Sequence, residues 1–326
     1  MSGSVLPSFI ALAPLAAGLS LAALTAAIAK RAAVDAPPLG RFIDVPGARL
    51  HVVDRGPTTR PGAPAIMLVH GLGGQLRHFS YQLIESLAPS YRVIAFDRPG
   101  SGYSSWRSGV KPSLAAQADL VDALAAHLQI ERVVLVGHSL GGAIALGAAL
   151  RHPARVAGLA LLAPLTHAPI RVSRQLVQTL RLADWVWRAL AWTVAVPVAR
   201  LQRERWLADI FAPDPVPVDF ASQGGGSLVL RPAHVLAAAR DLIDIPVWME
   251  ALTPCYPTLR SRPTLPIEVL YGRQDRVLSS VLQGERFTQA VQHARLHQID
   301  AGHMLPLTRP QECAELIRRV ADAAGG

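Results

Sequence analysis

The chain has 326 residues, 51% of them hydrophobic, so it is long enough for one large domain or two with a sizeable core. This composition excludes an intrinsically disordered protein. The net charge of +9 comes from scattered arginines and no zinc-finger, RRM or homeodomain pattern is present, so we expect no nucleic-acid partner.

The first segment is an apolar run from Val5 to Ala29 that contains no charged residue. A helix of this length, at about 1.5 Å per residue, would cross a hydrocarbon core of about 30 Å. The run ends at Lys30 and Arg31, and because no Lys or Arg precedes it, the positive-inside rule predicts that the rest of the chain lies in the cytoplasm. We therefore expect a bacterial-type inner-membrane anchor that contacts membrane lipid.

Two alternatives to the anchor stay open. Ala27-Ile28-Ala29 is a small-X-small site, so cleavage of a signal peptide there would leave a periplasmic or secreted protein. A buried helix packed on the domain is the third interpretation, which the absence of a polar face disfavours.

Beyond the anchor, strand patterns alternate with helix patterns. An alternating stretch with a Pro46-Gly47 turn predicts a hairpin over Arg41 to Gly56. Continuous apolar runs predict buried strands, and apolar residues at helical spacing predict helices. The expected strands are 65–69, 91–96, 133–136, 156–163, 266–271 and 294–299, and the expected helices are 79–88, 114–128, 143–150, 280–291 and 310–324. This order predicts an α/β fold, a mostly parallel sheet with helices on both faces.

A long insert from Thr166 to Pro263 lacks strand signals and holds five of the six tryptophans. We interpret it as a helical cap over the carboxyl edge of the sheet, where open α/β sheets form their ligand crevices. Within it, Gly224-Gly225-Gly226 predicts a flexible hinge. The predicted organisation is an anchor over 1–31, a linker over 32–40, a core over 41–165 and 264–326, and a cap over 166–263.

One cap segment has a second interpretation. Between Arg171 and Val194, a helical wheel gathers arginines on one side with Trp185 and Trp192 among them. This pattern suits a helix at a lipid headgroup interface, while a solvated arginine face is the alternative.

Ser139 lies where an apolar strand turns into a helix, in the sequence Gly137-His138-Ser139-Leu140-Gly141. Glycines two residues before and after the serine remove side chains that would collide at a sharp turn, which exposes the hydroxyl. The amide of Leu140 opens the following helix, where unpaired donors and the helix dipole favour an oxyanion. We predict a nucleophilic serine at this turn.

A serine nucleophile needs a base, and the base needs a group that fixes its tautomer. His303 follows the last predicted strand, and Asp275 follows the strand before it, so both are expected at the carboxyl edge. Asp300 is a rival acid, but it lies only three residues before the base. Asp97 is interpreted as a turn former.

The second oxyanion donor is expected in the segment His70-Gly71-Leu72-Gly73, from the backbone amide of Leu72. His70 and His138 are interpreted as hydrogen-bonded scaffold residues. Cys255 and Cys313 are interpreted as buried thiols. No His, Cys or carboxylate cluster has metal-ligand spacing, so we expect neither metal nor cofactor.

These motifs together resemble the α/β-hydrolase superfamily, and in particular its capped serine hydrolases of esterase or lipase type. The matching motifs are His-Gly-Leu-Gly-Gly at 70, Asp-Arg-Pro-Gly-Ser-Gly at 97, Gly-His-Ser-Leu-Gly-Gly at 137, Gly-Arg-Gln-Asp at 272 and Ala-Gly-His-Met at 301. The order Ser139, Asp275, His303 is the order of that superfamily. The resemblance implies acyl transfer to Ser139 and then to water or another acceptor.

This sequence differs from several other branches of the superfamily, and the differences disfavour the reactions of those branches. Epoxide hydrolases and haloalkane dehalogenases use an aspartate where this chain has Ser139, and carbon-carbon bond hydrolases usually carry a Ser-Gly-Pro-Gly oxyanion segment that is absent here. We therefore expect hydrolysis of a small-molecule carboxylic ester with a bulky or hydrophobic group. An acyltransferase, a carbon-carbon bond hydrolase and a non-catalytic binding module are the alternatives.

Overall fold

The computed structural model describes residues 6–57, 63–168 and 183–325. Its centre is a nine-stranded sheet with the order β1-β2-β4-β3-β6-β7-β8-β9, and β5 pairs with β2. β1 and β2 form an antiparallel hairpin, and every pair from β4 to β9 along this order is parallel. The strands are β1 Arg41–Val45, β2 Ala48–Arg55, β3 Ala65–Val69, β4 Val93–Phe96, β5 Ser105–Trp106, β6 Val133–His138, β7 Val156–Leu162, β8 Ile267–Gly272 and β9 Arg295–Ile299.

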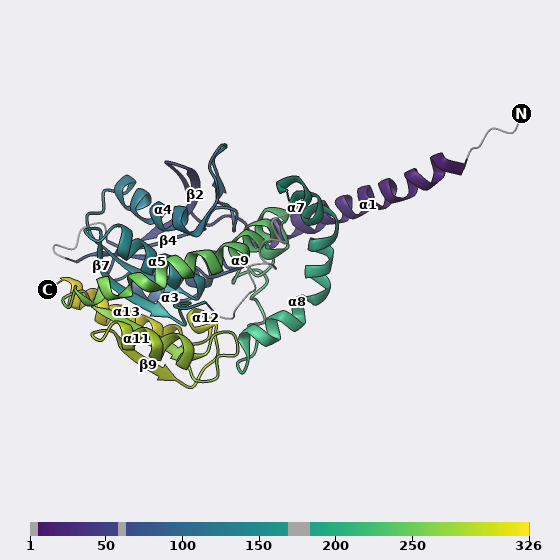
Figure 1. Ribbon diagram of the computed structural model, residues 1–326. Helices are drawn as coiled ribbons and strands as arrows, with labels where there is room; N and C mark the ends of the chain where they lie inside the picture. The colour runs from purple at the N-terminus through teal and green to yellow at the C-terminus, as the bar shows by residue number, and fades with distance from the viewer. Residues whose placement is uncertain (1–5, 58–62, 169–182, 326) are drawn as a thin grey trace, which may run out of the picture.

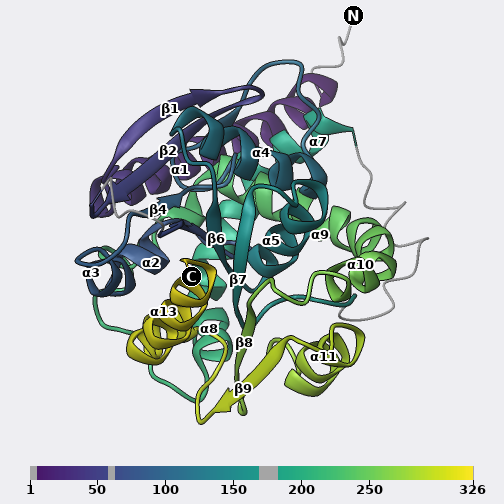
Figure 2. The ribbon, with the colours of Figure 1, turned by 90° about the vertical axis from the view of Figure 1, so that its left-hand side faces the viewer.

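Helices cover both faces of the sheet, with α4, α5 and α11 on one side and α3 and α13 on the other (Figure 2). The central strands β3, β4, β6, β7 and β8 are buried along their whole length, because each is mostly apolar and is covered from both sides. The core helices are α2 Arg77–Ser80, α3 Leu83–Leu87, α4 Leu114–His127, α5 Leu140–Arg151, α11 Arg286–Ala290, α12 Leu305–Thr308 and α13 Pro310–Gly325. The predicted α/β fold class is confirmed.

Two predicted helices differ in detail from the observed ones. The helix expected over 79–88 is two short helices, α2 and α3, because Gln82 between them has an extended φ of −150°. The helix expected over 280–291 starts with the π-helical turn η4, Val281–Glu285, before α11. In that turn Gln283 is buried, and its side chain accepts from the amides of Thr166 and His167 where the chain leaves the sheet for the insert.

The insert is helical, as predicted, over its described part. It contains α7 Asp184–Leu190, η1 Ala191–Ala195, α8 Val196–Phe211, η2 Leu228–Leu230, α9 Pro232–Leu252, η3 Thr253–Cys255 and α10 Tyr256–Arg260. Half of the segment between Arg171 and Val194, with three of its four arginines, lies outside the described residues, so its lipid-interface interpretation stays a prediction. Cys255 is exposed, so the expectation that both cysteines are buried is wrong for Cys255 and correct for Cys313.

The three-glycine segment is not an exposed hinge. All three glycines are buried, and the carbonyl of Gly224 accepts a hydrogen bond of 2.7 Å from the side chain of Gln75 in the core. A Cβ at Gly225, whose φ is +68°, would lie 2.3 Å from that same side chain. The glycines therefore allow close packing of the cap on the core, which corrects the predicted flexible hinge.

Helix α1, Leu6–Asp35, projects from the body of the protein, and α8 runs across its direction on the side from which it leaves (Figure 1). The stretch Ala16–Asp35 is long and apolar enough to cross a membrane, a property that signal sequences share, and little of it is buried against the rest of the protein. Ile28 near its end packs with Val196, Ala199 and Leu230 of the cap. The helix extends four residues past the predicted anchor end, into the predicted linker.

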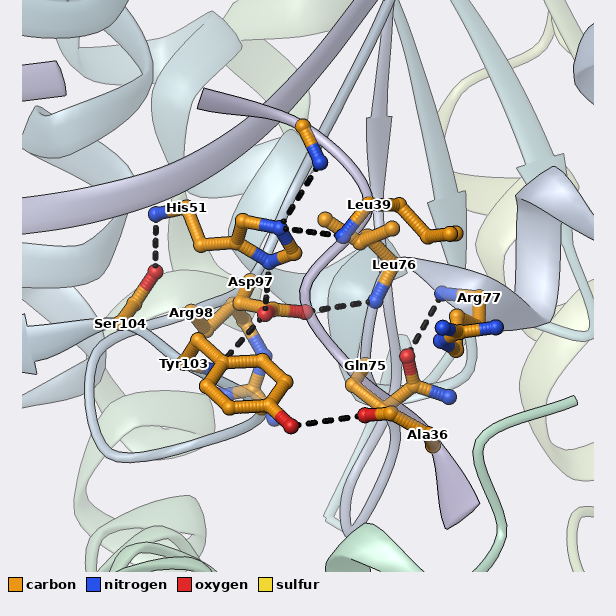
Figure 3. A network of polar contacts seen from close by, with 12 residues as sticks. Ala36, Leu39, His51, Gln75, Leu76, Arg77, Asp97, Arg98, Tyr103 and Ser104 are labelled. Carbon is orange, nitrogen blue, oxygen red and sulfur yellow. Dashed lines mark hydrogen bonds and ion pairs between the residues drawn. The ribbon is translucent and has the colours of Figure 1, made fainter. Parts of the chain in front are cut away.

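The segment after α1 is tied to the core by a polar network (Figure 3). The amides of Leu39 and Gly40 donate to Nε2 of His51, each at 3.1 Å. Because that nitrogen accepts, Nδ1 of His51 carries the proton and donates to Asp97 over 2.7 Å. The Tyr103 hydroxyl also donates to the carbonyl of Ala36 over 2.7 Å. These bonds set the direction in which α1 leaves the core.

Candidate active site

Ser139 lies between β6 and α5, with φ 54° and ψ −121°. A positive φ is rare and strained for a residue with a side chain, and it persists here because the surroundings are tightly packed. A Cβ at Gly137 would lie 2.5 Å from the carbonyl oxygen of Gly141, and one at Gly141 would lie 2.0 Å from that of Val69. Only glycine fits at these two positions, so the strand–turn–helix geometry expected around Ser139 is present.

Asp275 and His303 come from the loops after β8 and β9 and meet at the carboxyl edge of the sheet. Nδ1 of His303 lies 2.7 Å from Oδ2 of Asp275, and the two side chains are 4% and 1% exposed. The other carboxylate oxygen of Asp275 accepts from the amides of Val277 and Leu278 at 2.8 and 2.9 Å. Since the carboxylate accepts, Nδ1 of His303 donates, which leaves Nε2 as the basic nitrogen of the ring.

Asp300 and Asp97, the other acids considered from the sequence, have partners other than His303. Asp300 is on the surface, where its side chain is 83% exposed and pairs with Arg273 at 2.9 Å. Asp97 is buried and accepts from the amides of Leu76 and Tyr103, each at 2.8 Å, so it is the turn former that the sequence predicted.

His138 contacts the loop that carries His303. Its Nε2 lies 3.0 Å from the backbone carbonyl of His303, to which it donates, and its Nδ1 is buried without a partner among the described residues. Burial lowers the pKa of His138 well below its ordinary value, and the nearby His303 lowers it further. The ring is therefore a neutral support for the loop that carries His303.

The two predicted oxyanion donors border the serine. A Cβ at Gly71 would lie 2.9 Å from the Cβ of Ser139, so the loop that carries Leu72 packs directly against the turn at Ser139. Gly73 has a φ of +62°, a conformation that favours glycine. Among the described residues, the amides of Leu72 and Leu140 have no hydrogen-bond acceptor. Both therefore remain free to donate to a ligand.

His70 and Arg98 hold this loop in place. The amide of Arg98 donates to Nε2 of His70 over 2.9 Å, so the His70 ring donates through Nδ1 to the Gly71 carbonyl. The guanidinium of Arg98 donates to the carbonyls of His70 and Gly71 at 3.1 and 2.8 Å. Burial, and secondarily the charge of Arg98, lower the pKa of His70 well below its ordinary value. Both ring nitrogens of His70 are therefore hydrogen-bonded to backbone atoms.

The guanidinium of Arg98 also reaches the cap. It donates to Oδ2 of Asp241 on α9 over 2.7 Å and to Gln117 on α4 over 2.6 Å. Sequence reasoning missed both Arg98 and Asp241. The Asp-Arg-Pro-Gly motif contained the arginine, but no local signal marked an aspartate within the cap helix as its partner.

A cavity of about 350 Å³ lies between the core and the cap and includes Ser139 and His303 in its wall. The other lining residues are Gly71, Leu72, Gly73, His78, His138, Leu140, Leu165, Arg203, Trp206, Leu207, Ile210, Phe211, Phe220, Gly225, Gly226, Val229, Leu242, Ile245, Val277, Leu278 and Met304. Its surface is mostly apolar. Within the described part of the cap, Trp206 is the only tryptophan in the cavity wall, whereas Trp185 is exposed and Trp248 is buried. The number of tryptophans in the cap therefore does not predict how many line the cavity.

No group of three or more His, Cys, Asp or Glu side chains that could hold a metal ion occurs within the described ranges. His78, which lines the cavity, was missed by the sequence analysis. Burial lowers its pKa to about 4, so it presents a neutral imidazole to whatever fills the space.

Comparison with known proteins agrees with this architecture. The sequence pattern of the family described as the alpha/beta hydrolase fold matches residues 64–310. A 2-hydroxymuconate semialdehyde hydrolase from a Pseudomonas species is 30% identical over 288 residues, which cover 87% of this chain and 94% of that protein. The acetyltransferase component of an acetoin cleaving system from Cupriavidus necator is 37% identical over 131 residues, 40% of this chain but only 33% of that protein.

The structure of a membrane phospholipase A, described as a bacterial virulence factor, superimposes with a TM-score of 0.63 and 23% identity over 98% of both chains. This likeness shows a shared fold. Together with the family match over most of the chain, it leads to one conclusion: the chain belongs to the α/β-hydrolase fold family of enzymes.

Proposed function

We propose that this protein is a serine hydrolase that cleaves carboxylic esters of hydrophobic compounds. Ser139 is the nucleophile, His303 the general base and acid, and Asp275 the residue that orients His303. The amides of Leu72 and Leu140 stabilise the oxyanion. The observation that supports the proposal is one cavity wall containing Ser139, His303 and both unpaired amides, with Asp275 hydrogen-bonded behind the histidine.

The reaction has two halves. The Ser139 oxygen attacks the ester carbonyl carbon while its proton passes to Nε2 of His303. The tetrahedral adduct expels the alcohol, which takes that proton from His303 and leaves an acyl group on Ser139. A water molecule then attacks the acyl carbon and gives a proton to His303, the carboxylic acid departs, and the proton returns to Ser139.

The electrostatic environment suits these steps. The oxyanion forms beside the first turn of α5, where unpaired amides and the helix dipole favour negative charge. The amides of Val277 and Leu278 hold the Asp275 carboxylate in place beside His303, where its negative charge stabilises the imidazolium that forms. The apolar lining of the cavity favours a substrate with a hydrophobic acyl or alcohol group.

A carbon-carbon bond hydrolase is the second candidate, because a 2-hydroxymuconate semialdehyde hydrolase is related along almost its whole length. Incubation with 2-hydroxymuconate semialdehyde and analysis of the products tests it. An acyltransferase is favoured by the match to an acetyltransferase component, although that match spans a third of the other protein. If added alcohols divert the acyl group from the free acid, the enzyme is a transferase.

We further propose that α1 anchors the protein in a membrane, with the catalytic domain on the cytoplasmic side. The apolar stretch that ends before Asp35 and the likeness to a membrane phospholipase A support the anchor, and Lys30 with Arg31 supports the orientation. Retention in the membrane fraction after an alkaline wash tests the anchor. A C-terminal reporter that is active only in the periplasm would contradict the orientation, and cleavage after Ala29 would support a secreted form.

The main test is labelling with a fluorophosphonate probe, together with hydrolysis of esters of graded chain length. Wild-type protein should react, and the Ser139→Ala variant should neither react nor hydrolyse. Ser86→Ala, at an exposed position, is the control and should behave as wild type. Normal labelling of Ser139→Ala would remove the serine from its proposed role, and inertness of the wild type would favour a non-catalytic binding module.

A further inference from the structure

Arg203 on α8 is the only Lys, Arg, Asp or Glu in the wall of the catalytic cavity, as far as the described residues define it. It lies among apolar neighbours, three residues before Trp206 and four before Leu207, which also line the cavity. The catalytic steps proposed above do not involve Arg203. We therefore asked what else a cation in the cavity wall could bind.

The side chain of Arg203 is half-buried, and its guanidinium lacks the partners that the fully buried Arg98 has. Its Nε atom is buried and has no hydrogen-bond acceptor in the described parts of the chain. Arg98, by contrast, donates to two carbonyls, a glutamine and an aspartate. A buried N–H donor without an acceptor is costly, so an arginine with its Nε in this state is well suited to receive an anion from outside the protein.

Nearby carboxylates do not supply that anion. Asp35 and Glu204 raise the pKa of Arg203 through space, but burial and the neighbouring Arg200 lower it, and the lowering is larger. Asp35 is already paired with Arg31 at 2.9 Å. The positive charge of Arg203 at the cavity wall is therefore not balanced by these carboxylates.

The position of α8 indicates from which side such an anion arrives. α8 packs against α1 and crosses it on the side where α1 leaves the body (Figure 1). Trp206 and Leu201 on α8 are 45% and 85% exposed. If α1 spans a membrane as proposed above, α8 lies close to the membrane surface, where an amphiphile has its charged group.

We infer that Arg203 binds an anionic group of the substrate, and that the substrate is an amphiphile bearing a phosphate or a carboxylate. This inference rests on the proposed ester hydrolase function. The planar guanidinium, with its several N–H donors, matches either anion in a two-point contact.

The first experiment compares matched esters with the full-length protein in detergent. Dihexanoyl phosphatidate and dihexanoylglycerol differ in a phosphate, and 6-(hexanoyloxy)hexanoate and hexyl hexanoate differ in a carboxylate. Wild type should prefer the charged member of at least one pair. Arg203→Gln should lower the ratio of charged to neutral kcat/KM about tenfold to a hundredfold, mainly through KM, and Arg203→Lys should restore part of it.

Arg200→Gln is the matched control, since Arg200 is exposed and lies one turn away on the same helix. It should keep the wild-type ratio. A loss confined to the phosphate pair identifies a phosphate lipid, and a loss confined to the carboxylate pair identifies an acidic ester. Three results would overturn the inference: no preference in the wild type, an equal loss on charged and neutral esters, or the same change in Arg200→Gln.

A second measurement does not depend on turnover. Ser139→Ala protein should bind hexyl phosphate or hexanoate more tightly than hexanol in calorimetry, and adding Arg203→Gln should remove that difference. If wild type neither reacts with a fluorophosphonate nor hydrolyses any ester, the proposed function fails. The calorimetry still decides whether Arg203 binds an anion, so the two failures are distinguishable.

Discussion

Nδ1 of His303 lies 2.7 Å from Oδ2 of Asp275, and this contact joins two loops that are 28 residues apart in the chain. The carboxylate has its second oxygen fixed by two backbone amides, so it has little freedom to turn away from the imidazole. The histidine is therefore held in one tautomer with its other nitrogen available, the state that a serine nucleophile requires.

Replacement of Asp275 by Asn should leave the fold intact and lower kcat by about 10³- to 10⁴-fold, because the amide donates where the carboxylate accepts and favours the wrong tautomer. The retained carbonyl oxygen still accepts from Val277 and Leu278. Measured kcat and melting temperature check both statements. Activity near the wild-type value would assign the acid to another residue.

Gly71→Ala should abolish most activity while the protein stays folded. The added methyl group would lie 2.9 Å from the Cβ of Ser139 and 3.2 Å from the carbonyl oxygen of His138, so it must displace the nucleophile turn or the loop of Leu72. Gly73→Ala is the comparison, since a Cβ there meets no atom within 4 Å and only the φ of +62° opposes it. If both variants lose the same activity, the contact between Gly71 and Ser139 is unimportant.

Arg98→Met should destabilise the protein by about 3–5 kcal/mol, because it leaves the carboxylate of Asp241 buried without its partner. The two side chains are 2% and 7% exposed. Arg273→Met removes an exposed pair, 55% and 83% exposed, and should cost at most about 1 kcal/mol. Urea unfolding of both variants tests this contrast, and combining Arg98→Met with Asp241→Leu should recover part of the loss.

Stability should fall as the pH drops from about 6.5 toward 4. Burial lowers the pKa of both His78 and His234 to about 4 in the folded protein, whereas an unfolded histidine titrates near 6.5. The unfolded chain therefore binds more protons in this window, so stability is highest above it and declines with acidification.

His78→Gln should make that decline shallower by up to about 1.4 kcal/mol per pH unit, as one of these groups is removed. Urea unfolding at pH 7, 6 and 5 measures the slope. His127→Gln, at an exposed position, is the control and should keep the wild-type slope. An unaltered slope in His78→Gln would mean that His78 has an ordinary pKa.

Local sequence determined most of the fold. Apolar runs such as 65–69 predicted buried strands at the observed residues, since a strand covered on both faces needs apolar side chains at most positions. The glycines around Ser139 predicted the sharp turn there, and the structure shows why they are needed, because the close contacts at Gly137 and Gly141 leave no room for a side chain. The expected positions of Asp275 and His303 followed from topology, as the ends of neighbouring parallel strands share one edge.

Contacts between distant segments had no such local signal. The sequence showed the length of the apolar N-terminal run. The packing of this helix on α8, through Ile28 and Val196, depends on how the cap folds and could not be predicted. The partnership of Arg98 with Asp241, and the placement of an unpaired Arg203 in the cavity wall, arise only when the cap closes on the core. Sequence thus determined the strands and the turn at Ser139, whose causes are local, whereas the tertiary structure decided the shape and charge of the pocket, because residues far apart in the chain build it together.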